Sequence, residues 1–122
     1  MDWCKRFGRA AEDAAAAFLA GRGVHILKRN FRCRIGEIDL IGKEGDTYLM
    51  IEVKARMDQG QGFPGEAVDR WKQDKICRAF DYYRMRNHLH EDTPVRFDVI
   101  ELDSKLEIRW IKNAFDYIGR QV

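Results

Sequence analysis

The stretch Gly36-Glu37-Ile38-Asp39-Leu40-Ile41, followed after a short polar break by Met50-Ile51-Glu52-Val53-Lys54-Ala55-Arg56, decides the fold of this 122-residue chain. Both segments are rich in β-favouring apolar residues and predict neighbouring strands in the core of a sheet. Each segment also carries ionisable residues where a packed strand would rather have none. These charges require an explanation beyond packing.

A two-residue turn at Gly45-Asp46 is expected to join the two strands, because glycine at the first central position suits a type II′ hairpin. In that register Asp39 lies opposite Glu52, and Lys54 projects from the same face as Glu52. A four-residue loop from Lys43 to Asp46 would instead make Asp39 a diagonal neighbour of Glu52 on the same face. Either turn brings the two carboxylates together.

Two carboxylates opposed across a hairpin repel each other unless positive charge lies between them. Lys54 could supply part of that charge. A divalent cation would do so better, because hard oxygen ligands fixed on adjacent strands suit Mg²⁺ or Mn²⁺. The pattern therefore favours a metal site at Asp39 and Glu52.

An Asp, a gap and then Glu-x-Lys on a hairpin is the arrangement of the PD-(D/E)xK nuclease superfamily. Such a triplet alone would be a weak signal, because it arises often by chance. Here it stands within a series of ordered matches, and the chain is identified as a member of the bacterial YraN-like family, an uncharacterised group that resembles the archaeal Holliday junction resolvases. The matches are Gly8-Arg9-Ala10-Ala11-Glu12, Arg29-Asn30-Phe31-Arg32-Cys33-Arg34, Gly36-Glu37-Ile38-Asp39-Leu40-Ile41, Gly45-Asp46-Thr47, Glu52-Val53-Lys54, Glu66-Ala67-Val68-Asp69, Lys72-Gln73, Arg96-Phe97-Asp98-Val99 and Asn113-Ala114-Phe115.

The resemblance implies a single endonuclease-like domain over residues 1–122, with an α/β, restriction-endonuclease-like (Holliday junction resolvase-like) fold. It implies a metal-dependent endonuclease that hydrolyses phosphodiester bonds in DNA, including branched or repair intermediates. Asp39, Glu52, the Val53 carbonyl and Glu12 would hold Mg²⁺ or Mn²⁺, and Lys54 would orient or help activate the attacking water. Ala55 departs from the family pattern, in which a hydroxyl residue commonly follows the lysine.

Composition is typical of a globular protein, with 45% hydrophobic and 34% charged residues. No apolar run approaches the roughly 20 residues of a membrane span, and the first residues lack a secretory hydrophobic region, so a cytoplasmic location is expected. The three cysteines, Cys4, Cys33 and Cys77, are widely spaced and predict free thiols. The net charge of +2 conceals an acidic centre, residues 37–66, between basic blocks at 1–36 and 67–90.

The order of elements predicts a central mixed sheet of about five strands flanked by helices. Helices are expected at about Lys5–Ala20, ended by Gly21 or Gly23, and at about Gly65–Arg86. Strands are expected at Val24–Phe31, at the central hairpin, at Val95–Leu102 and at Leu106–Ile111, the last two joined by a tight turn at Asp103-Ser104-Lys105. The glycine-rich loop Met57–Gly65 could close over a substrate or simply connect.

Basic residues beside the hairpin are expected to contact nucleic acid. Four basic residues in seven surround Phe31, and guanidinium groups bind phosphates well; a strand edge protected by charge is the rival explanation. The residues that we expect to bind nucleic acid are Arg29, Asn30, Arg32, Arg34, Arg56, Lys72 and Gln73. The second helix has a stripe at helical spacing, and its aromatic residues are interpreted as core rather than as a platform for base stacking. The stripe comprises Val68, Trp71 or Lys72, Ile76, Ala79 or Phe80, and Tyr83.

Some assignments stay open. Glu12 can be read as a solvent-exposed helix acid, and Glu37 as a ligand or as a partner of Arg34 or Arg56. Asp98 is read as a structural or surface acid. A homodimer would suit cleavage of both strands of a junction, although no segment spells out an interface. The rival functions are a nucleic-acid-binding or partner-recruiting module without catalysis, and a purely structural ion-pair network, for which Asp39→Asn should raise stability.

Overall fold

The computed structural model of the chain describes residues 3–56 and 68–119, with side chains from Phe7 onward. These residues form two helices and five strands in an α/β arrangement. The elements are α1 (Trp3–Ala20), β1 (His25–Arg32), β2 (Glu37–Glu44), β3 (Thr47–Ala55), α2 (Arg70–Arg86), β4 (Val95–Leu102) and β5 (Ile108–Phe115). The expected number of strands and their order along the chain are confirmed.

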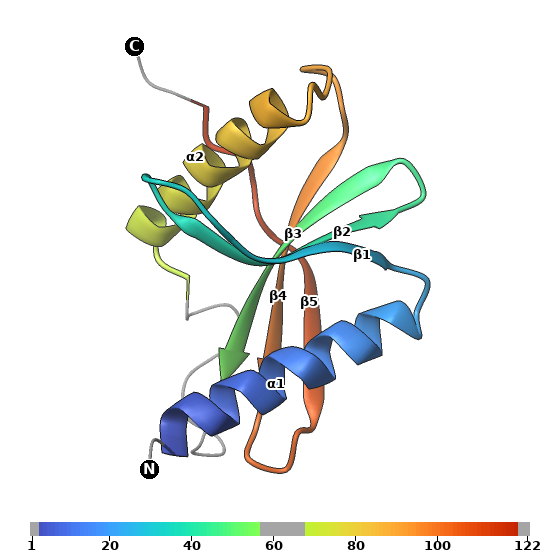
Figure 1. Cartoon of the computed structure of the whole chain (residues 1–122), viewed down its shortest axis with the longest axis vertical. Coiled ribbons are helices and arrows are strands. Elements are labelled where there is room, and N and C mark those ends of the chain that lie inside the picture. Colours follow the sequence, from blue (N-terminus) through green and yellow to red (C-terminus); the bar gives the residue numbers. More distant parts are fainter. Residues whose placement is uncertain (1–2, 57–67, 120–122) are drawn as a thin grey trace.

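The strands form one mixed sheet in the order β1-β2-β3-β4-β5. All neighbouring pairs are antiparallel except β3 and β4, which are parallel and are connected through α2. A parallel connection needs a crossover, and α2 supplies it. Figure 1 shows the sheet strongly twisted, with α1 and α2 on opposite sides of the strands. This is an α/β fold consistent with the restriction-endonuclease-like class.

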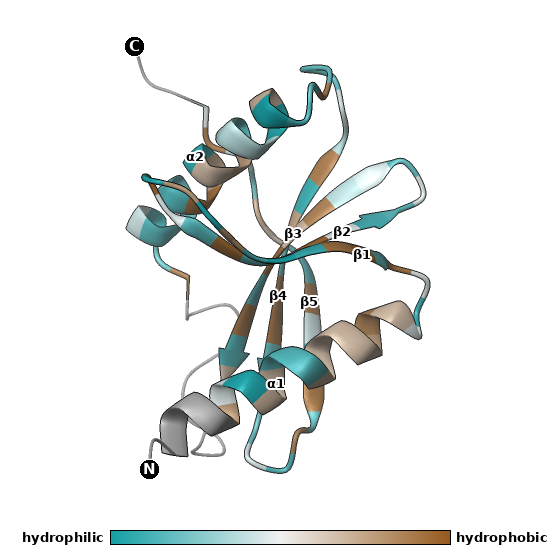
Figure 2. Ribbon diagram, in the orientation of Figure 1, coloured by the Kyte–Doolittle hydropathy of each residue, from teal (hydrophilic) through white to brown (hydrophobic). Residues whose placement is uncertain are grey.

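Each face of the sheet has its own core under one helix. Ala11, Ala15 and Leu19 of α1 are fully buried against one face, together with Leu40 and Ile51. The small alanines let α1 lie close to the strands. The other core lies under α2 and contains Ile38, Ile41, Met50, Ile76, Phe80, Tyr83 and Phe97. Figure 2 shows the apolar residues concentrated along the strands and on part of α1.

The central hairpin has the predicted turn. Glu44 pairs with Thr47, which leaves Gly45-Asp46 as the two-residue loop. Gly45 has φ +60°, and Asp46 is not among the described non-glycine residues with positive φ, as a type II′ turn requires. Gly23, with φ +88°, likewise lies at the predicted end of α1. Glycines with positive φ therefore mark the end of α1 and the turn between β2 and β3.

Helix α2 begins later than predicted. Asp69 has an extended backbone, and its carboxylate accepts a hydrogen bond from the backbone nitrogen of Lys72, which is an N-cap interaction. The helix therefore starts at Arg70, not at Gly65; the glycine-rich loop at 57–65 lies outside the described residues. The placement of Trp71 in the core is wrong, because this side chain is 70% exposed.

The last strand is displaced toward the C-terminus relative to the prediction. β5 runs from Ile108 to Phe115, and Leu106 lies in the preceding turn with φ +62°. The turn predicted at residues 103–105 is present, because the Leu106 backbone nitrogen donates to the Asp103 carbonyl oxygen at 2.9 Å. The connection is longer than predicted, because the Asp103 carboxylate also accepts hydrogen bonds from the backbone nitrogens of Lys105 and Glu107. Phe115 stacks on Phe97 with ring centroids 5.1 Å apart. The aromatic side chain of Phe115 therefore packs onto β4 from within β5.

A fully buried acid joins β4 to β5. Asp98 is 0% exposed and accepts hydrogen bonds from the Arg96 guanidinium, the Trp110 indole nitrogen and the Asn113 backbone nitrogen, the last two at 2.9 Å. The register between the two strands shifts between Phe97 and Val99, and Asn113 has φ +53°. Asp98 is thus structural. It accepts the hydrogen bonds of donors near the point where the pairing of β4 and β5 is irregular.

Candidate active site at the fork between two strands

The candidate site lies where β2 and β3 separate. Their pairing runs from Glu44 and Thr47 to Leu40 and Ile51 and ends there. The next residues in that register are Asp39 and Glu52, so the predicted register is correct but the ladder stops one pair before the acids. The Asp39 carboxylate instead accepts a hydrogen bond from the Val53 backbone nitrogen at 2.8 Å. The two acids therefore lie at the mouth of a fork.

A local break in the alternation of side chains opens this fork. Leu40 packs in the core under α1, whereas Ile38, two residues earlier, packs in the core under α2. In a regular strand both would face the same side. Asn30, which lies across from Asp39 in the register of β1 and β2, has φ +53°. The β1–β2 hairpin thus turns away from β3 at Asp39, and Figure 1 shows its end curving toward α2.

Asp39 and Glu52 are close enough to share a proton. Glu52 is only 6% exposed. Burial, followed by the negative charge of Glu52, raises the pKa of Asp39 from an ordinary 3.8 to about 7, against the opposing hydrogen bond from Val53. A hydrogen bond between the two carboxylates adds to the rise. Near neutral pH the surrounding positive charge is therefore insufficient to keep both carboxylates ionised.

Two lysines meet these carboxylates. Lys72 of α2 places its Nζ 2.5 Å from Glu52 Oε1. Burial alone would lower the pKa of Lys72, but hydrogen bonding to Glu52 and the charge of Glu52 raise it overall. Burial, and then the neighbouring charge of Lys72, lower the pKa of Lys54. One cation is thus bound to the carboxylates, while the other is made easier to deprotonate.

Glu12 approaches the site from α1 but is held by β1. Its Oε1 accepts a hydrogen bond from the Asn30 side chain at 2.8 Å and lies 3.3 Å from the Arg29 guanidinium. Its charge is a minor cause of the raised pKa of Asp39, so the three acids share one neighbourhood. Over residues 3–56 and 68–119, however, no group of three or more His, Cys, Asp or Glu side chains is arranged to hold a metal ion. The structure thus brings Asp39, Glu52 and Lys54 together, whereas the Glu12 carboxylate nearby is bonded to Asn30 and Arg29.

The residues expected to bind nucleic acid fall into two groups. Several are engaged within the protein: Arg29 pairs with Glu12 and Asp13, Asn30 with Glu12, Arg56 with Glu101, Lys72 with Glu52, and the Gln73 amide donates to the Val68 carbonyl. Arg32 and Arg34 point outward and are exposed, and Arg32 pairs with Glu37 at 3.3 Å on the surface. The partner of Glu37 is therefore Arg32, which the sequence analysis did not name.

Sequence reasoning missed that Lys72 belongs to the carboxylate cluster. A local signal exists, because Asp69 caps the helix through the Lys72 backbone nitrogen and so fixes the first turn of α2. That signal gives the start of a helix but not the face that meets β3. The contact with Glu52 depends on how α2 crosses the sheet, which the spacing of residues does not encode.

The fold and the fork together define an α/β protein of the restriction-endonuclease-like class, with a pair of acids and a Glu-x-Lys motif at the centre of its sheet. Residues 11–102 match the sequence profile of the family described as "Uncharacterised protein family UPF0102". The chain belongs to this family, and the expected resemblance is confirmed. Among the part of the chain that the structure describes, neither helix is long and apolar enough to cross a membrane.

Similar proteins occur in distant bacteria. The chain is 46% identical over 112 residues to a UPF0102 protein of Lachnoclostridium phytofermentans, covering 92% of this chain and 94% of that protein. It is 42% identical over 116 residues to a UPF0102 protein of Nitrosomonas eutropha, covering 95% and 98%. A UPF0102 protein of Legionella pneumophila is 38% identical over 110 residues, covering 89% and 93%. These three matches thus cover 89–95% of this chain.

Proposed function

We propose that this protein is a metal-dependent endonuclease that hydrolyses phosphodiester bonds in DNA at the fork between β2 and β3. The observation that carries the proposal is the pair Asp39 and Glu52, crowded together at the end of a strand ladder with the pKa of Asp39 raised to about 7. Strongly perturbed acids beside a lysine are more frequent at catalytic sites than elsewhere. A structural role alone gives no reason to crowd them.

The residues present suit a hard divalent cation. Asp39 and Glu52 offer carboxylate oxygens, and the Val53 carbonyl lies next to them in sequence; Glu12 would join directly or through water. The ammonium of Lys72 already bonds to Glu52, so positive charge is accommodated at this position. Bound Mg²⁺ or Mn²⁺ would supply a Lewis acid for the phosphate and a lowered pKa for a coordinated water.

The protein's own lysines would do the remaining work. Lys54 shares the face of Glu52, and its lowered pKa suits a group that orients or deprotonates the attacking water. Lys72, held on Glu52, would neutralise charge that develops on the phosphate oxygens. Arg32 and Arg34, exposed near the fork, would contact the flanking phosphates. A homodimer would present two such sites to the two strands of a junction. Light scattering would measure the mass of the protein in solution and so its oligomeric state.

A second function is favoured by a specific contact. Lys72 occupies the carboxylate cluster as a built-in cation, and the described residues present no three-ligand metal group. A nucleic-acid-binding or partner-recruiting module would need the cluster only as a stable ion-pair network. Such a protein would bind DNA and cut nothing.

Cleavage tests the proposal directly. Linear, single-stranded, flap and four-way-junction DNAs are incubated with Mg²⁺ or Mn²⁺ and with wild type, Glu52→Gln or Lys54→Met. We expect metal-dependent cutting that falls by about three orders of magnitude or more in both variants, because each removes a group from the transition state. Glu107→Gln, an exposed acid in the β4–β5 connection, is the matched control and should cut normally. Absence of cutting by wild type, with salt-sensitive binding retained by both variants, would favour the binding module.

A further inference from the structure

Trp71 is the most exposed of the large apolar side chains in the described part of the chain. Its indole is 70% exposed in the first turn of α2, although tryptophan usually buries most of its surface. Of the other aromatics of the helix, Phe80 and Tyr83 are buried in the core and Tyr82 is half-buried. An exposed indole on an otherwise well-packed helix offers a surface on which a planar aromatic group can stack.

This indole belongs to the residue that precedes a member of the candidate active site on α2. Trp71 precedes Lys72, whose ammonium reaches Glu52, and the two Cα atoms are about 3.8 Å apart. Successive helical residues point about 100° apart, so Lys72 turns toward the fork while Trp71 faces outward beside it. A molecule stacked on the indole would therefore lie next to the carboxylates.

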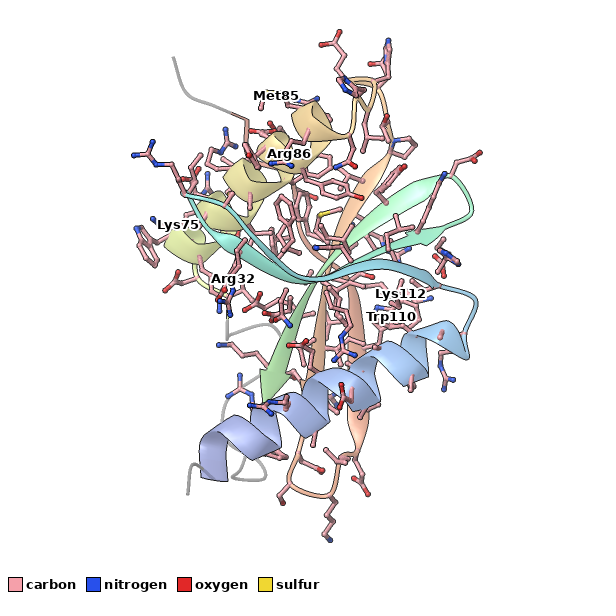
Figure 3. All side chains as sticks on the ribbon, in the orientation of Figure 1. Arg32, Lys75, Met85, Arg86, Trp110 and Lys112 are labelled. Atoms are coloured by element: carbon pink, nitrogen blue, oxygen red, sulfur yellow. The ribbon has the colours of Figure 1, made fainter. Side chains whose placement is uncertain are left out.

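Cationic groups frame the indole. The Lys75 ammonium lies 4.6 Å from the centre of the Trp71 ring. The turn between β1 and β2 abuts the same helix, because a Cβ at Gly36 would lie only 3.0 Å from the Lys75 carbonyl oxygen. That turn carries Arg34 and follows Arg32, and Figure 3 shows Arg32 and Lys75 on the same side of the molecule. Arg70, next to the indole along the helix, is exposed as well.

We propose that Trp71 stacks on an unpaired base, while Lys75 and Arg32 contact the adjacent phosphates. An aromatic face with flanking cations is how proteins bind single-stranded nucleic acid. In continuous duplex both faces of each base are covered, so only an unpaired nucleotide can use this platform. Resting on the proposed endonuclease function, the inference names its substrate class as DNA with an unpaired segment beside the scissile bond, such as a flap, a gap or a single strand.

The surrounding charge favours this ligand over an apolar protein segment. Of the basic neighbours of the indole along the helix, Lys75 lies over its ring and Arg70 is exposed, whereas Asp74 is directed to Arg78 at 3.7 Å. An apolar docking surface would be expected to have further exposed apolar neighbours around its tryptophan. On α2 the other strongly exposed apolar side chain is Met85, three turns and more away.

Binding measured with EDTA tests the stacking independently of cleavage. The probes are a fluorescent single-stranded oligothymidylate and a strand of equal length and charge in which abasic sites replace the bases. We expect Trp71→Ala to weaken oligothymidylate binding about tenfold and abasic binding less than twofold. Trp71→Phe should retain most of the affinity. Met85→Ala, an equally exposed position on the same helix at 64%, is the matched control and should bind both probes like wild type.

Two results would overturn the stacking role. One is an unchanged affinity of Trp71→Ala for oligothymidylate. The other is an equal loss of affinity for both probes, which would mean that the variant alters charge or folding rather than contacts with bases. Cleavage of a flap separates this inference from the proposed function. If wild type cuts and Trp71→Ala binds and cuts identically, the stacking role fails and the nuclease stands. If wild type cuts nothing but Trp71→Ala loses its preference for bases, the stacking role stands and the nuclease fails.

Discussion

Asp98 and Asp39 are both acids inside strands of the same sheet, yet their surroundings differ. Asp98 is completely buried, and an arginine, an indole and a backbone nitrogen donate to its oxygens. Asp39 is only half-buried, receives one backbone hydrogen bond, and faces a second carboxylate. The more buried acid is the better satisfied one.

This difference shows that burial by itself does not distinguish structure from function. A buried carboxylate surrounded by donors completes the hydrogen bonding of an irregular strand pair. A carboxylate that shares its space with another acid is short of positive charge and becomes a place for a cation or a proton. The same residue type thus has opposite consequences for stability at the two positions, and mutation can measure them.

Removing Asp98 is expected to have the largest effect on stability. Asp98→Ala leaves the Arg96 guanidinium, the Trp110 indole nitrogen and the Asn113 backbone nitrogen without their acceptor. Breaking a buried pair in this way costs about 3–5 kcal/mol of unfolding free energy. Urea denaturation followed by circular dichroism measures it. A loss below about 1 kcal/mol would mean that water or Glu44 replaces the acid, and the contrast with Asp39 would weaken.

Removing the charge of Asp39 should stabilise the metal-free protein. Because its pKa is raised to about 7, the folded state binds more protons than the unfolded state between about pH 4 and 7. Stability in EDTA is therefore highest below this window and is lost as pH rises through it. Asp39→Asn keeps an acceptor for Val53 and should flatten this dependence, with a gain on the order of 1–3 kcal/mol at pH 8.

The same variant separates a metal site from an ion-pair network. Wild type at pH 8 should gain thermal stability on addition of Mg²⁺ or Mn²⁺, because a ligand that binds the folded state stabilises it. Asp39→Asn should gain much less. Equal stabilisation of both proteins, or of neither, would contradict metal binding at the fork. Asp39 and Glu52 would then be members of an ion-pair network.

Glu12 offers an intermediate case with the smallest expected effect. Its partner Arg29 is substantially exposed, with 41% of its side chain accessible. Exposed ion pairs contribute about 0–1 kcal/mol, so Arg29→Met should change the urea midpoint only slightly. The variant frees Glu12 from one of its two partners. If Glu12 then completes the cluster, the affinity for Mn²⁺ in a calorimetric titration should rise; an unchanged affinity would place Glu12 outside the metal site.

Much of the fold follows from local patterns in the sequence. The helix α1, the turn at Gly45 and the strand β4 each depend on neighbours within a few residues, and each is confirmed. The start of α2 and the position of β5 differ from the prediction because Asp69 and Asp103 use their carboxylates to organise the backbone. Those interactions are local, but they compete with the periodicity of apolar residues.

By itself the sequence determined the family, the hairpin register and the meeting of Asp39, Glu52 and Lys54, because a period of two and a two-residue turn fix which side chains share a face. Only the tertiary structure decided how those charges are balanced. It brought Lys72 to Glu52, tied Glu12 to Arg29, enclosed Asp98 and left Trp71 in solvent. The partners of a charge come from distant segments, and they depend on where a strand bends and how a helix crosses the sheet.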